Sequence, residues 1–197
     1  MNETPEKLPV TSHLFCFATN LNNFVMIDLI RSRRSIRKYT QQLIESDKLE
    51  LFKETVLRAP SSRNSNACKF IFVDNLSMIE KLAHCKMSGA TALQTAPLAV
   101  VILANESQTV AWIEDCSIAS ILLQITAHSL GLGSCWIQIR GRSHHEEKTS
   151  ETYVKEILNI PDELRVLSII SLGYPQNMPE GRPFGELDFN RIYCNKF

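Results

Sequence analysis

Apolar positions along this chain follow two patterns, one typical of helices and one typical of strands. Spacings of three and four residues predict helices over 26–33, 46–58, 76–86, 88–95, 112–130 and 146–158. Short continuous apolar runs predict buried strands at 70–73, 98–103, 135–139 and 166–172. At least four strands mixed with five or six helices indicate an α/β or α+β fold.

Local signals mark several ends of these elements. Ser46 is a plausible N-cap of the helix over 46–58, and Pro60 ends that helix and opens a polar loop. Gly131 and Gly133 are stop signals for the helix over 112–130. The last 25 residues show no sustained period, so we expect an irregular tail.

The helix over 112–130 is apolar on most of its circumference. Its polar positions form one narrow stripe: Ser117, Ser120, Gln124 and His128. A helix of this kind is buried on nearly all sides, and in a chain of this size a second subunit can supply part of the cover. The uncharged stretch 116–139 is long enough to cross a bilayer. Its polar residues and glycines favour a buried helix followed by a buried strand instead.

The first 25 residues differ from the rest of the chain. They are rich in Asn and Thr, lack a helical or strand period and carry no proper signal peptide. A regular pattern begins at Met26. We therefore predict an N-terminal extension over 1–25 and one domain over 26–197.

Composition excludes several classes of protein. The chain has 197 residues and a formal net charge of zero, which argues against a domain that coats nucleic acid or an acidic membrane surface. Six cysteines are scattered without a CxxC pair, which is typical of reduced thiols in a cytoplasmic protein rather than of a disulfide framework or a zinc site. We expect no metal site. The dinucleotide-binding and P-loop glycine motifs do not occur.

Two segments could bind a ligand. Five of the eight residues over 31–38 are cationic, and arginine side chains with a nearby serine suit a phosphate group. The alternative is a solvated basic surface at a helix end. The loop over 59–66 is rich in Ser and Asn, whose amides match the polar edge of a heterocycle. The alternative there is an ordinary turn.

Two further segments are not diagnostic alone, but the ordered set of four is. Gly131-Leu132-Gly133-Ser134-Cys135-Trp136 reads as a helix stop before a core strand, and Leu172-Gly173-Tyr174-Pro175 reads as a turn that ends a strand. Together with 33–39 and 59–66, in this order, they resemble the nitroreductase-like family of flavoproteins. The resemblance covers 26–197. It implies an α+β fold with a central, mainly antiparallel sheet flanked by helices, and a homodimer that binds FMN at the subunit interface.

The resemblance also implies roles for individual residues. Residues that would hold the FMN phosphate and ribityl chain are Arg33, Arg34, Ser35 and Arg37, with Arg182 from the tail. Residues that would lie along the flavin ring or bond its polar edge are Pro60, Ser61, Ser62, Asn64 and Asn66, and the far side would be lined by Trp136, Ile137 and Gln138. Because the flavin carries the hydride, no side chain is nominated as catalytic. The chain departs from the family pattern at Cys68, where many relatives have Trp, and at Phe184, where relatives often have a second basic residue.

The implied function is an FMN-dependent oxidoreductase. NADH or NADPH would reduce the flavin, which would then reduce nitroaromatics, quinones or a similar electron-poor small molecule in a ping-pong exchange. Alternatives within the fold are a specialised flavin enzyme, such as a reductive dehalogenase or an enzyme that consumes its flavin. A non-catalytic flavin-binding protein is the alternative from another class.

Overall fold

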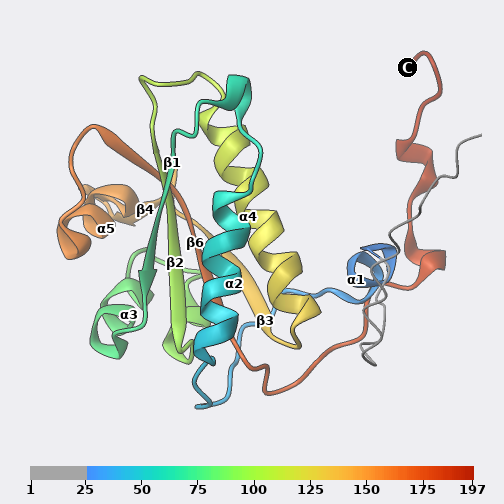
Figure 1. Cartoon of the computed structure of the whole chain (residues 1–197), viewed down its shortest axis with the longest axis horizontal. Helices are drawn as coiled ribbons and strands as arrows, with labels where there is room; N and C mark the ends of the chain where they lie inside the picture. Colours follow the sequence, from blue (N-terminus) through green and yellow to red (C-terminus); the bar gives the residue numbers. More distant parts are fainter. Residues whose placement is uncertain (1–25) are drawn as a thin grey trace, which may run out of the picture.

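The computed structural model describes residues 26–197, so the predicted extension over 1–25 lies outside the described residues. A four-stranded sheet forms its centre, in the order β1 (Cys68–Val73), β2 (Leu98–Asn105), β6 (Leu164–Gly173) and β3 (Gly133–Gln138) (Figure 1). Every neighbouring pair in this sheet is antiparallel. The predicted α+β fold with a mainly antiparallel sheet is therefore confirmed.

Helices cover both faces of the sheet. On one face lie α2 (Ser46–Leu57) and α4 (Trp112–Ser129), and on the other lie α3 (Leu76–Ala83) and α5 (Ser150–Leu158) (Figure 1). The central strand β2 alternates between the two cores, with Val100 and Ile102 packed on the α2/α4 side and Val101 and Leu103 on the α3/α5 side. Burial on both sides explains why this strand reads as one unbroken apolar run.

A β-bulge interrupts the pairing between β2 and β6. Ile102 pairs with Ser168 and Leu103 with Val166, which leaves Leu167 as the extra residue. The carbonyl of Leu167 instead accepts hydrogen bonds from the backbone of Ile139 and Arg140, at 3.1 and 3.0 Å. The bulge thus fixes the chain where it leaves β3.

The predicted end of the long helix is confirmed. Gly131 adopts φ +78°, and its N–H bonds to His128 O while that of Leu132 bonds to Ala127 O. This pattern is a Schellman motif, which favours glycine at the left-handed position. The helix itself is not covered all round within one chain, because Ile118 and Ile121 are 38% and 41% exposed.

Several local predictions are wrong. Glu45, not Ser46, is the N-cap of α2, and its carboxylate accepts the hydroxyl of Tyr174 rather than capping the helix. The predicted helix over 88–95 is a single 3₁₀ turn, Thr91–Gln94. The helix predicted over 146–158 begins only at Ser150, because the Thr149 side chain accepts a hydrogen bond from Thr152 N and caps the helix there. The residues before it form a hairpin of β4 (Ser143–His145) and β5 (Lys148–Thr149). Strands this short leave no periodic signal.

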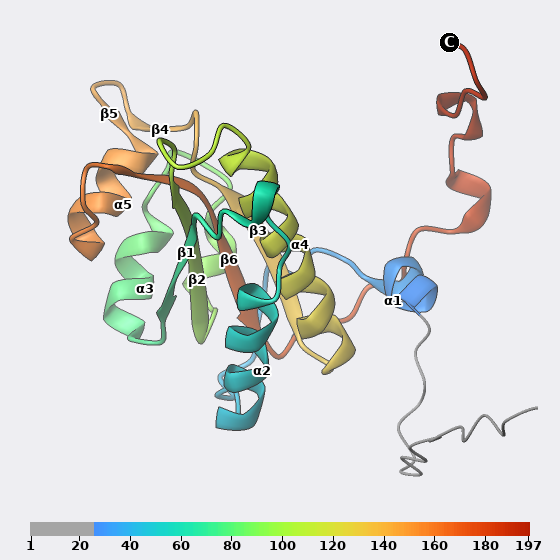
Figure 2. The same cartoon turned by 45° about the horizontal axis from the view of Figure 1, so that its top comes forward.

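Helix α1 (Met26–Ser32) and the C-terminal tail lie to one side of the sheet and its helices (Figures 1 and 2). The tail is irregular, as predicted, apart from the 3₁₀ turns Phe184–Glu186 and Phe189–Arg191. It crosses the end of α1 at Gly181, where a Cβ atom would come within 1.8 Å of the Arg31 carbonyl oxygen. Only glycine allows this approach.

Within residues 26–197, no helix is long and apolar enough to cross a membrane. The five cysteines of this part of the chain are free thiols, and they lie at positions 68, 85, 116, 135 and 194.

Glu151 ties α5 to β6, and its loss is expected to destabilise the fold. Its carboxylate accepts from Nε and Nη2 of Arg165 and from Val166 N, each at 2.9 Å. Burial acts to raise the pKa of Glu151, but these hydrogen bonds and the positive charge of Arg165 outweigh it and lower the pKa. The stabilisation is therefore complete above the ordinary pKa of about 4.3 and is lost as the pH falls through the lowered value.

We expect Glu151→Gln to lower the free energy of unfolding at pH 7 by about 1–3 kcal/mol, because a partly buried, charge-assisted bidentate bond is lost. Urea denaturation at pH 7 and between pH 3 and 5 measures this. The exposed Glu147→Gln is the matched control. Equal stability of the two variants at pH 7 would disprove the role given to Glu151.

Candidate FMN site

The basic segment after α1 is held against the start of β3. Ser35 forms an isolated parallel bridge with Ser134, and the N–H of Ile36 donates to Ser134 O at 2.9 Å. The Ile36 side chain is buried in the core. With Ile36 turned inward, the neighbouring polar side chains are directed away from the core.

These side chains line a cavity of about 310 Å³. Its walls are Arg33, Arg34, Ser35 and Arg37, together with Pro179 of the tail. Among the residues that the structure describes, no carboxylate belongs to this lining. Arg34 Nη1 donates to Glu180 O at 2.9 Å, which fixes the tail over the cavity. The predicted phosphate ligands from this segment are therefore gathered around one space.

Arg33 gives the strongest indication that this segment binds an anion. Its Nη1 atom is buried and has no hydrogen-bond partner among the described residues. A buried guanidinium nitrogen without a partner is costly, and the guanidinium group of Arg33 belongs to a residue that lines the cavity, where an anion would interact with its charge. The chemistry of the lining, three guanidinium groups and one hydroxyl, fits a phosphate group.

His128 of α4 anchors the start of this segment through a hydrogen bond to Ser32, a role that the sequence did not reveal. Its Nε2 lies 2.8 Å from Ser32 Oγ, which itself donates to Asp28 O. Burial, together with the positive charge of Arg33, lowers the pKa of His128. The imidazole is therefore neutral at pH 7 and adds no charge to the arginine cluster. Because the Ser32 hydroxyl gives its one proton to Asp28 O, the imidazole donates its Nε2–H to Ser32 Oγ.

The second predicted group, the loop over 59–66, lies at the other end of α4. The N–H of Ser62 donates to Asp115 Oδ1 at 2.8 Å, and Ser61 Oγ accepts from Asn66 N at 3.0 Å. Asp115 was not nominated from the sequence. The available signal is the pair of carboxylates, Glu114 and Asp115, in the first turn of a largely apolar helix. Asp115 is buried, and its Oδ2 has no partner among the described residues.

The loop backbone is unusual. Arg63, Asn64 and Asn66 all adopt left-handed conformations, with φ between 50° and 55°. Asparagine tolerates this region better than most residues, so the two asparagines have a backbone role whatever they bind. Asn66 Nδ2 donates to Asn64 O at 3.1 Å, which closes the loop on itself. A non-glycine residue such as Arg63 in this region stores strain, which is common at binding sites.

The third predicted group lies on β3 and divides between the two faces of the sheet. The side chain of Ile137 is fully buried in the α3/α5 core, so only its backbone is available to a ligand. Trp136 and Gln138 lie on the opposite face and are half-buried. Trp136 Nε1 donates to Gln138 Oε1 at 2.9 Å, which orients both side chains.

Arg182 does not join the arginine-lined cavity in this chain. Its side chain is 66% exposed, and its Nε lies 4.0 Å from Glu186 Oε2. The residue of the tail that lines the cavity is Pro179 instead. Phe184, the other departure in this region, is exposed.

One chain does not bring all predicted residues together. The arginine segment is fixed near His128 and the loop near Asp115, and these anchors lie 13 residues apart on α4. That spacing corresponds to about 20 Å along the helix. Over residues 26–197, the two cavities at these anchors share no lining residue. Within a single chain, the site is present as two separated halves.

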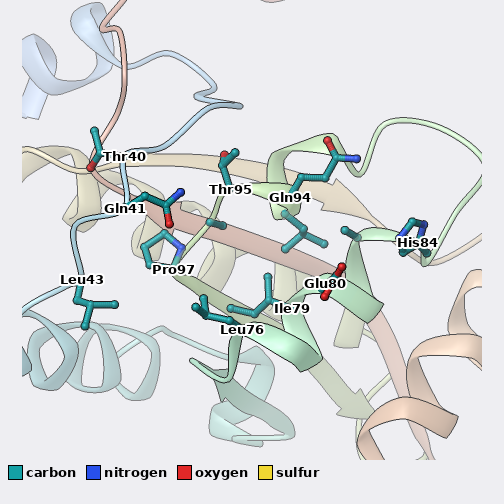
Figure 3. Close-up of a pocket in the computed structure, with 13 residues that line it drawn as sticks. Thr40, Gln41, Leu43, Leu76, Ile79, Glu80, His84, Gln94, Thr95 and Pro97 are labelled. Atoms are coloured by element: carbon teal, nitrogen blue, oxygen red, sulfur yellow. The ribbon is translucent and has the colours of Figure 1, made fainter.

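A further cavity, of about 350 Å³, lies between α3 and the segments around Thr40 and Thr95 (Figure 3). It contains none of the predicted site residues. Glu80 is its one formally charged side chain among the residues described, and no lysine or arginine lines it. Its chemistry does not suit a phosphate.

Comparison with known proteins identifies the family. A family model described as the nitroreductase family matches residues 30–95 and 83–174. A solved FMN-dependent nitroreductase from Clostridium difficile R20291 is 38% identical, with a TM-score of 0.85, and the match covers 87% of this chain and 99% of that chain.

Two curated relatives agree. A protein from Archaeoglobus fulgidus, provisionally named as an NADH dehydrogenase/NAD(P)H nitroreductase, is 32% identical over 87% of this chain and 98% of its own length. The FMN reductase (NADPH) of Bacillus subtilis is 25% identical over 80% of this chain and 68% of its own length. Since the family model spans most of the chain, including both halves of the site, the protein belongs to the nitroreductase family.

Proposed function

We propose that this protein is an FMN-dependent NAD(P)H oxidoreductase that reduces nitroaromatics, quinones or similar electron-poor small molecules by ping-pong hydride transfer. The observation that carries the proposal is the cavity lined by three arginines and a serine. One of these arginines, Arg33, also has a buried Nη1 atom without a described partner. The positive charge of this lining favours a bound anion, and the phosphate of FMN is one. Membership of the nitroreductase family connects it with a flavin.

The residues of the arginine segment bind and orient the phosphate. Arg33, Arg34 and Arg37 supply guanidinium donors, and Ser35 supplies a hydroxyl. The loop residues Pro60, Ser61 and Ser62 pack along the ring, Asn64 and Asn66 approach its polar edge, and Trp136, Gln138 and the backbone of Ile137 line the far side. Arg182 reaches the phosphate only after the tail has moved from its place beside Glu186.

A homodimer completes the site. The loop of one protomer lies beside the arginine segment of its partner. The two halves of the site, about 20 Å apart along α4 within one chain, are thereby brought together across the interface. The exposed apolar side chains of α4 and α1 supply the interface: Ile118 and Ile121 on α4, and Met26, Ile27 and Ile30 on α1. A self-complementary contact of this kind is typical of two-fold dimers.

The protein contributes binding and orientation rather than proton transfer. When bound, FMN supplies the hydride chemistry. The described groups around the two half-sites are guanidinium, hydroxyl and amide groups, with the carboxylate of Asp115, which accepts from Ser62 N and so holds the loop. The histidine nearby, His128, is neutral and bonded to Ser32. We therefore assign no side chain as a general acid or base. The catalytic domain is 26–197, with 1–25 as an extension, and reduced thiols fit a cytoplasmic location.

An absorption spectrum of the freshly purified protein, followed by anaerobic addition of NADH and then NADPH, tests the proposal. We expect a flavin band that either donor bleaches. A colourless protein that fails to take up added FMN would overturn the site. A flavin band that neither donor bleaches would overturn the oxidoreductase function and favour a non-catalytic flavin-binding protein.

A further inference from the structure

Two thiols meet beneath the loop over 59–66. Cys68 is the first residue of β1, directly after this loop, and Cys116 follows Asp115 in the first turns of α4. Their Sγ atoms lie 3.3 Å apart. Cys116 is fully buried, whereas Cys68 is half-buried. The two residues are 48 positions apart in sequence, so only the packing of β1 against α4 brings them together.

We propose that Cys68 and Cys116 form a peroxide-sensitive pair that is oxidised to a disulfide beneath the loop. The pair is separate from the flavin chemistry, and its formation does not depend on the proposed function. A disulfide has an S–S distance of about 2.05 Å, so the two sulfurs need to approach by only about 1 Å.

The surroundings give a small oxidant access to the pair. A cavity of about 70 Å³ is lined by Cys68 and by residues of the loop and α4, among them Pro60, Ser61 and Asp115. A space of this size admits water-sized molecules, which includes hydrogen peroxide. Cys68 lines the cavity and Cys116 does not. The oxidant therefore meets Cys68 first.

The two thiols also differ in acidity, which assigns their roles. The hydrogen bond from the Cys116 thiol lowers the pKa of Cys68, although burial and Asp115 act in the opposite direction. The same hydrogen bond, together with burial, raises the pKa of Cys116. The thiolate is the nucleophile in such chemistry. Cys68 is thus the residue that attacks the peroxide, and Cys116 is the resolving thiol.

The reaction consumes one hydrogen peroxide for each bond. The Cys68 thiolate attacks one peroxide oxygen, forming an S–O bond while the O–O bond breaks and hydroxide leaves, to be protonated to water. The sulfur of Cys116 then attacks Cys68 sulfur, forming the S–S bond while the S–O bond breaks and a second water leaves. Two thiols lose two electrons in total, and the peroxide gains them.

The expected consequence is a change in the loop. Asp115, the neighbour of Cys116, holds Ser62 N at 2.8 Å, and Cys68 begins the strand that follows the loop. A bond between the cysteines therefore moves both attachment points of the loop by a fraction of the 1 Å approach. This consequence rests on the proposed function, because it matters to the flavin only if the loop contacts it.

Peptide mapping of the full-length protein after graded hydrogen peroxide tests the bond directly. We expect a mass loss of two hydrogens per protomer and a linked peptide pair containing Cys68 and Cys116, both reversed by dithiothreitol. In Cys116→Ser, Cys68 should stop at the sulfenic acid, which dimedone traps. Cys194→Ser removes an exposed thiol and should leave the linkage unchanged.

Separate alkylation of Cys68 and Cys116 in wild-type protein, under conditions that oxidise Cys194, would overturn the proposal. Mapping of the wild type decides this even if a variant fails to fold. Flavin retention after oxidation is a second measurement. A linked pair in protein that never binds FMN would leave the disulfide established and remove the proposed function, so the two failures are distinguishable.

Discussion

Replacing Arg33 and Arg34 together by alanine is expected to weaken FMN binding by at least about a hundredfold. Each charge-assisted hydrogen bond to a phosphate contributes roughly 1.5–3 kcal/mol, so the loss of two costs at least about 3 kcal/mol. Since about 1.4 kcal/mol corresponds to a tenfold change in affinity, this loss corresponds to at least about a hundredfold. Both side chains line the same cavity, with Pro179 and two other donors. Fluorescence titration of the apoprotein with FMN measures the dissociation constant.

The fold is expected to tolerate these changes. Arg34 is exposed, and Arg33 carries the buried Nη1 atom that has no partner among the described residues. Removing an unpaired buried donor does not lower the free energy of unfolding of the apoprotein. Arg58→Ala, at the end of α2 beside Glu54, is the matched control and should bind FMN normally. Wild-type affinity in the double variant would refute the phosphate site.

Replacing Ile121 by glutamate is expected to convert the proposed dimer to monomers and to release FMN. Ile121 and Ile118 lie on the uncovered face of α4, 41% and 38% exposed in one chain. A two-fold interface over this face would bury one carboxylate from each protomer, which costs several kcal/mol without a partner. Sedimentation velocity measures the association state, and the absorption spectrum measures the flavin.

A substitution at position 121 tests association of the chains without preventing folding of the single chain. Leu123 is fully buried in the core of its own chain, so a charge there would prevent folding and would not inform about the dimer. Met87→Glu places the same charge on an exposed apolar residue of the α3 side and should leave dimer and flavin unchanged. A wild-type protein that sediments as a monomer, or an Ile121→Glu dimer that retains FMN, would contradict the proposed interface.

The local elements with strong periodic signals are the ones that the sequence predicts correctly. All four predicted strands and the helices over 46–58, 76–86 and 112–130 occur, with shifted ends. The failures are short elements. The hairpin Ser143–Thr149 and the 3₁₀ turn Thr91–Gln94 are too short for a period, and their conformations depend on caps and turns.

The residues of the candidate site are also predicted only in part from the sequence. The basic segment is visible in the sequence because five of its eight residues are cationic, and the structure places Arg33, Arg34, Ser35 and Arg37 around one cavity. Asp115 and His128 are not visible as site residues, because each is one of several polar residues on a largely apolar helix, and the sequence does not show which of them has a partner at the site. Their partners, Ser62 and Ser32, come from distant parts of the chain.

The sequence by itself therefore determines a fold of mixed helices and strands, the family resemblance with the α+β class that it implies, and the residue types that suit a phosphate and a flavin. These depend on periodicity and on motifs of adjacent residues. Tertiary structure alone decides which residues meet. It turns Ile137 into the core, keeps Arg182 out of the arginine cavity, places Cys68 against Cys116 and separates the two halves of the site along α4. These outcomes depend on the register of strands and the packing of helices, which are contacts between residues far apart in sequence.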